Sequence, residues 1–69
     1  MVEVFRTNVQ KKAESKFVLR LLAETFLASK INFDLSDIDN VLRVEGDSVE
    51  SRRIMLLVKE NGFICEVLE

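Results

Sequence analysis

The order of helix-like and strand-like segments along the chain constrains its fold most strongly. Apolar residues recur at three- and four-residue steps over residues 9–28 and 48–61, which predicts two amphipathic helices. The stripe of the first helix is expected to hold Ala13, Phe17, Val18, Leu21, Leu22 and Ala28. Segments that are β-branched or that alternate apolar with polar residues predict strands. These segments are residues 2–7, 31–35, 41–45 and 63–68.

Turn and capping residues separate these segments. Asn8 and Ser48 can cap the two helices, because a short polar side chain there accepts a free backbone N–H of the first turn. Gly62 is suited to end the second helix, and the polar run 36–40 favours a hairpin turn. The order β-α-β-β-α-β predicts one α+β, ferredoxin-like domain over residues 1–69. Two helices would cover one face of its four-stranded antiparallel sheet.

Size and charge narrow the class of protein. A 69-residue chain with one cysteine and no histidine has no internal disulfide, so its core must supply its stability. The formal net charge is −2 with the two signs intermixed, which disfavours nucleic acid as a partner. No stretch is apolar enough for a membrane span or an export signal, and a lone thiol suits a reducing compartment. We therefore expect a cytoplasmic protein without a membrane partner.

No catalytic constellation is visible. The chain lacks histidine and tyrosine, places no nucleophile beside a base, and has no glycine-rich phosphate loop. Arg6 is followed by Thr7-Asn8-Val9, without the glycines that an acylphosphatase-like phosphate cradle uses. RNA-recognition motifs share the topology but stack bases on aromatic residues, which segment 41–45 lacks. The sequence predicts neither an enzyme nor a cofactor.

A series of positions gives the chain a family resemblance. Phe17 and Leu21 stand four and eight places beyond Ala13. Later apolar and glycine positions continue the pattern at Ile31, Phe33, Leu35, Leu42, Val44, Ile54, Val58, Gly62, Phe63 and Cys65. Together they resemble the heavy-metal-associated domain, the fold of copper chaperones and of the metal-binding domains of copper-pumping ATPases.

The resemblance fails at the metal motif. In that family, Gly-Met-x-Cys-x-x-Cys follows the first strand. Here the cysteine positions fall on Gln10 and Ala13, and the Gly-Met pair on Thr7 and Asn8. Neither glutamine nor alanine suits soft Cu(I), which selects thiolates. The resemblance thus implies a copper-chaperone scaffold without its metal site.

Two other features are weak candidates for metal ligands. Cys65 can be a buried small hydrophobe or a metal-binding thiol. Asp34, Asp37 and Asp39 can bind a hard cation or simply form a solvated hairpin turn. A metal-handling protein that uses Cys65 or this turn is the alternative function.

The uncovered sheet face is the candidate interface. If Cys65 faces the helices, the two-residue period of a strand turns Ile64 and Leu68 outward. The first strand would add either Val2 and Val4 or Glu3 and Phe5, with Arg43 at the rim. Scattered apolar residues are ordinary on surfaces, but a contiguous patch predicts a homodimer or a protein partner. We predict a non-enzymatic binding module. Its candidate interface residues are Ile64, Leu68, Val4, Phe5 and Arg43.

The first helix also carries a basic edge. It consists of Lys11, Lys12, Lys16 and Arg20. Such an edge is either a solvated helix face or a docking surface for an acidic partner.

Overall fold

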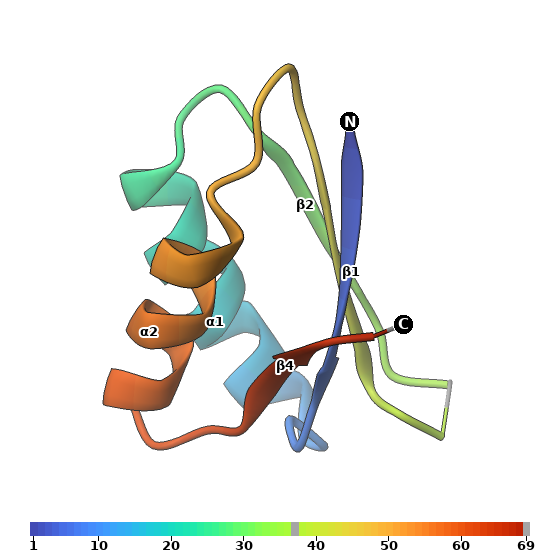
Figure 1. Ribbon diagram of the computed structural model, residues 1–69. Coiled ribbons are helices and arrows are strands. Elements are labelled where there is room, and N and C mark those ends of the chain that lie inside the picture. Colours follow the sequence, from blue (N-terminus) through green and yellow to red (C-terminus); the bar gives the residue numbers. More distant parts are fainter. Residues whose placement is uncertain (37, 69) are drawn as a thin grey trace.

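The computed structural model describes residues 1–36 and 38–68, and it confirms the predicted element order. Two helices lie on one face of the sheet, and the opposite face is uncovered (Figure 1). The elements are β1 (Val2–Thr7), α1 (Lys12–Thr25), β2 (Lys30–Asp34), β3 (Val41–Glu45), α2 (Ser51–Glu60) and β4 (Cys65–Val67).

The four strands form one antiparallel sheet in the order β2-β3-β1-β4. β1 therefore lies inside the sheet, where Phe5 pairs with Leu42 of β3 and with Val67 of β4. β2 and β4 are the edges. This is the predicted ferredoxin-like arrangement, in which each strand alternates between a face packed on the helices and a face in solvent.

The core fills the space between the sheet and the two helices. It is built from inward side chains of β1, β3 and β4 and from one stripe of each helix. Its buried members are Phe5, Val9, Val18, Leu22, Phe26, Leu42, Val44, Ile54, Val58 and Cys65. Among the described residues, every buried side-chain oxygen or nitrogen has a hydrogen-bond partner.

The first helix is shorter than predicted, and it buries only part of the predicted stripe. It begins at Lys12 instead of residue 9 and ends at Thr25 instead of residue 28. Val18 and Leu22 are fully buried, whereas Phe17 is 50% exposed. The sequence contains two overlapping stripes with four-residue spacing, and either one satisfies the helical period. Contact with the sheet, which the pattern does not contain, selects the second stripe.

The helix caps also differ from the prediction at their beginnings. Lys11 and Glu50 hold the N-cap positions, so neither Asn8 nor Ser48 caps a helix. The end of α2 is as predicted. Gly62 has φ 93° and donates its N–H to the carbonyl of Lys59 at 3.0 Å, which terminates the helix in a left-handed turn.

Neither helix, within the described residues, is long and apolar enough to cross a membrane.

Substitutions in α1 distinguish the two stripes. Leu22→Ala should lower the free energy of unfolding by about 2–5 kcal/mol, because it removes a fully buried side chain and leaves a cavity. Phe17→Ala should cost less than about 1 kcal/mol, because half of that side chain is already in solvent. Urea denaturation of the two variants measures the difference. A larger loss for Phe17→Ala would contradict the observed helix face.

Candidate functional site

The first loop, residues 8–11, follows β1 at the place where the family resemblance puts a metal motif. Buried Thr7 fixes its start, because the Thr7 hydroxyl donates to the carbonyl of Asn40 at 2.6 Å and accepts the N–H of Val9 at 3.2 Å. The N–H of Thr7 also donates to the carbonyl of Asp39 at 3.1 Å. These bonds attach the loop to the turn between β2 and β3.

The burial pattern of α1 allows a second register for the cysteine positions of the family motif, one residue later than the predicted one. The predicted alignment placed Phe17 and Leu21 four and eight places beyond the second cysteine position, but Val18 and Leu22 are the fully buried pair. Counting back four places from Val18 puts the second cysteine position at Glu14 and the first at Lys11. The predicted positions Gln10 and Ala13, one residue earlier, are the other register.

The side chain of Glu14 bonds to the backbone of the loop. Oε1 of Glu14 accepts the N–H of Lys11 at 3.0 Å and the N–H of Gln10 at 3.3 Å. This carboxylate thus caps the first turn of α1, where the helix dipole favours a negative charge. Lys11 and Glu14 in one register, or Gln10 and Ala13 in the other, bring no thiol into the loop. Neither pair offers the ligands that Cu(I) selects.

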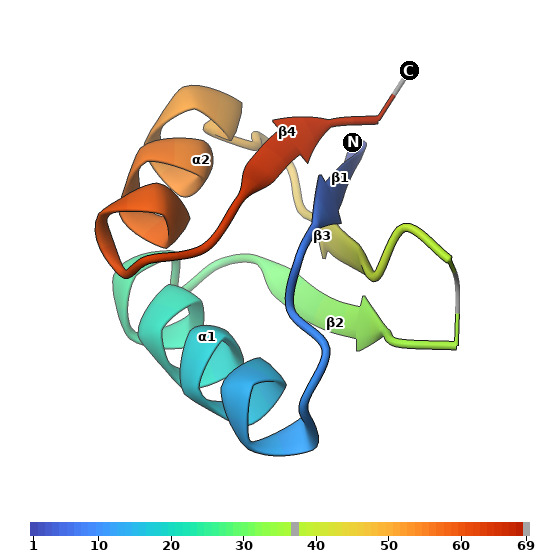
Figure 2. The same ribbon diagram turned by 90° about the horizontal axis from the view of Figure 1, so that it is seen from below.

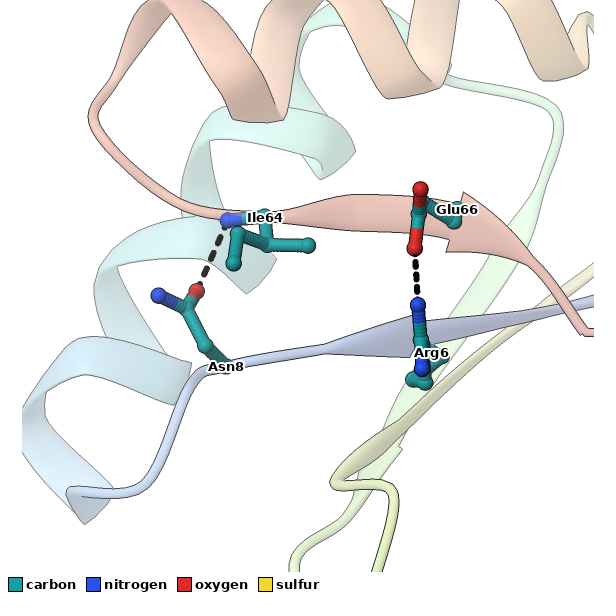
Figure 3. Close-up of polar contacts among 4 residues, drawn as sticks. All are labelled: Arg6, Asn8, Ile64 and Glu66. Atoms are coloured by element: carbon teal, nitrogen blue, oxygen red, sulfur yellow. Dashed lines mark hydrogen bonds and ion pairs between the residues drawn. The ribbon is translucent and has the colours of Figure 1, made fainter.

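Bonds to β4 hold the other side of the loop. Oδ1 of Asn8 accepts the N–H of Ile64 at 2.7 Å (Figure 3). Two residues along each strand, the guanidinium of Arg6 forms an ion pair with the carboxylate of Glu66 (Figure 3). The hydrogen bond and charge of Arg6 lower the pKa of Glu66. The polypeptide itself therefore holds together the segments that flank the loop.

Cys65 lies in the core on the inner side of β4. Burial raises the pKa of its thiol to about 12, from an ordinary value near 9, even though the charge of Lys59 acts in the opposite direction. A thiol in this environment stays protonated at neutral pH. It therefore resembles a small hydrophobic side chain more than a nucleophile or a metal ligand.

The acidic hairpin turn is only partly described, because Asp37 lies outside the described residues. Oδ1 of Asp34 accepts the N–H of Ser36 at 3.1 Å and its hydroxyl at 2.6 Å. The carbonyl of Asp39 accepts the N–H of Thr7. The Asp34–Ser36 bonds are local turn bonds, and the Asp39–Thr7 bond ties the turn to β1. The described residues contain no group of three or more Cys, Asp or Glu side chains that could hold a metal ion.

The register of β1 decides which residues reach the open sheet face. Phe5 is fully buried against the helices, so it is not part of that face, and Val2 and Val4 point outward. The N–H of Leu68 donates to the carbonyl of Val4 at 2.8 Å, and Val4 pairs with Arg43 of β3. Val2 and Leu68 are 42% and 39% exposed. We call Val2, Val4 and Leu68 the open-face patch.

Ile64 belongs to a different place on the surface. The Arg6–Glu66 ion pair lies between it and Leu68 along β4, so the predicted interface is divided. Ile64 instead borders a pocket of about 260 Å³ together with Asn8 and Ile38. Ile38 is 93% exposed. The sequence placed Ile38 in a turn but contained no signal for which element the turn would approach.

The burial of Cys65 has a measurable consequence. At neutral pH, a disulfide reagent should label the native thiol slowly and the denatured thiol at once. Because the folded-state pKa is raised above the unfolded one, the protonated thiol stabilises the fold below about pH 9. The free energy of unfolding should fall by roughly 1 kcal/mol per pH unit above that value. Cys65→Ala should remove this slope in urea titrations, and rapid labelling of the native protein would contradict the burial.

Comparison with known proteins gives one structural match. No family model and no curated protein matches the sequence. A search of solved structures finds the solution structure of the yeast copper transporter domain Ccc2A, determined in apo and Cu(I)-loaded states. The match has a TM-score of 0.82 at 20% sequence identity and covers 99% of this chain and 94% of the yeast domain. The chain therefore has the fold of a copper-transporter domain, as the resemblance to heavy-metal-associated domains predicted.

Proposed function

We propose that this chain is a non-enzymatic protein-binding module that has a heavy-metal-associated scaffold without the metal site, and that it self-associates through the open face of its sheet. The observation that carries the proposal is the open-face patch. Val2, Val4 and Leu68 lie together on a sheet face that no other element covers (Figure 1). Contiguous exposed apolar residues of this kind are typical of interaction surfaces.

The charges around the patch suit a symmetric contact. Glu45 pairs with Val2 across β1 and β3, and Arg43 pairs with Val4. On the far side of β3, Lys30 pairs with Glu45. Positively and negatively charged side chains therefore both lie next to the apolar patch. A surface of this composition can be complementary to itself when two copies meet about a two-fold axis.

The first loop supports the loss of metal transfer. Moving Cu(I) between proteins by ligand exchange needs thiolates in an accessible loop, and neither register of the alignment supplies one. The loop keeps its shape through the Thr7, Asn8 and Glu14 hydrogen bonds instead. The alternative of metal handling through Cys65 is disfavoured by the burial and raised pKa of that thiol.

Sedimentation equilibrium tests self-association. The wild-type protein should show a concentration-dependent monomer–dimer equilibrium, because the open-face patch is buried on association. Leu68→Glu should shift it to monomer, since it places a charge in the centre of an apolar contact. Leu27→Glu is the matched control, because Leu27 is 85% exposed and lies between α1 and β2. A wild-type monomer at all concentrations, or equal effects of the two variants, would overturn the self-association.

Titration of the reduced protein with Cu(I) against a competing chelator tests the metal site. We expect no transfer of copper from the chelator and no shift of the backbone amide signals of residues 7–14. Cys65→Ala is the informative control. Tight binding that survives this substitution and moves the loop would restore a chaperone function, and binding that the substitution abolishes would support the metal-handling alternative.

A further inference from the structure

The basic edge of α1 lies beside the edge strand β2. Lys12, Lys16 and Arg20 follow one another at four-residue spacing, so they form one row along the helix. α1 contacts β2 along this side, and Figure 2 shows the two elements next to each other. Lys12 and Lys16 of the predicted basic edge are therefore part of a surface that the helix shares with the sheet.

A groove of about 510 Å³ lies on the surface between the two elements. Its apolar lining consists of Leu19 of α1, Phe33 of β2 and Leu35, and all three side chains are only half-buried. Lys12 and Lys16 stand exposed along its helix side. None of the described residues that line the groove is acidic. In a chain of net charge −2, this groove combines an apolar surface with positive charge alone.

The groove runs along an edge of the sheet that has no neighbouring strand. β2 pairs with β3 on one side only, because it is the terminal strand in the order β2-β3-β1-β4. Its other side presents backbone N–H and C=O groups of the kind that template an added strand. Proteins commonly protect such an edge with a proline, a bulge or charged side chains. β2, Lys30–Asp34, carries charges only at its two ends, has no proline and pairs with β3 in unbroken register.

We propose that the groove between α1 and β2 binds an extended segment of a partner protein that combines acidic with β-branched or aromatic residues. The segment adds to β2 as a fifth strand, so its backbone pairs with the strand edge. Its apolar side chains contact Phe33 and Leu19, and its carboxylates lie near Lys12 and Lys16. The proposal rests on the proposed function as a protein-binding module and does not depend on self-association.

A second copy of this chain is a poorer occupant. Two β2 strands that pair in antiparallel fashion about a two-fold axis bring their helices onto the same face of a continuous sheet. Lys12 and Lys16 of the two copies, which line the grooves, would then face each other across the junction. Like charges in that position destabilise the contact, whereas an acidic segment neutralises them.

Selection from a library of short random peptides displayed on phage tests the proposal. The selected peptides should combine aspartate or glutamate with β-branched or aromatic residues. The synthetic peptide should shift the amide signals of Ile31–Asp34 in NMR spectra and bind more weakly as salt rises. Lys12→Glu combined with Lys16→Glu should weaken binding about tenfold or more. Arg52→Glu combined with Lys59→Glu is the control, since it makes the same charge change on α2 and should leave the affinity within about twofold.

Several outcomes would overturn the proposal: no selected peptide, selection without acidic residues, equal losses in the two double variants, or shifts confined to the open face. Dissociation of a wild-type dimer by the peptide would assign the groove to a second copy instead. Leu68→Glu separates this proposal from the self-association, because it removes the open-face contact and should retain peptide affinity. Failure of the peptide alone therefore leaves the dimer standing, and failure of the dimer alone leaves the groove standing.

Discussion

The inward orientation of Phe5 and Thr7 on β1 is the constraint on which the rest of the molecule depends. A small chain without a disulfide must bury its apolar surface between one sheet and two helices. β1 lies inside that sheet, so burial of Phe5 fixes the register of both neighbouring strands. Because a strand alternates its side chains, the same choice turns Val2 and Val4 outward. The core of the protein thus determines the composition of its exposed face.

Hydrogen bonds of the chain itself close the first loop. A bound ion would link the loop to the beginning of the helix through its ligands. Here the hydroxyl of Thr7 and the side chain of Asn8 tie the loop to the neighbouring turn and to β4, and Glu14 caps the helix. Each such bond contributes about 0.5–1.5 kcal/mol. The delayed start of α1 follows from this closure, because residues 8–11 are held in a loop instead of a helical turn.

The sequence alone predicts local structure where a single residue determines it. It does not predict structure where two sets of residues fit the same helical period. Gly62 ends α2 as predicted, because few residues other than glycine adopt φ 93° without strain. The predicted stripe of α1 was too wide, since it held both Phe17 and Val18, and contact with the sheet buries only Val18. The division between Ile64 and Leu68 depends on Arg6, which comes from a strand 60 residues away from Glu66. The groove between α1 and β2 likewise cannot be predicted from a local stretch of sequence, because its two sides belong to different elements.

The positions of the two proposed surfaces determine how they would work together. The open-face patch lies on β1 and β4, whereas the groove lies at the opposite edge, with β3 between them. One surface uses the face of the sheet and the other uses its rim, so binding at one does not cover the other. Self-association through the face would therefore present two basic grooves on one particle. A partner with two acidic segments would bind such a dimer more tightly than a monomer, because the second contact forms at a high effective concentration. With both proposed surfaces, the dimer would thus act as a bivalent adaptor.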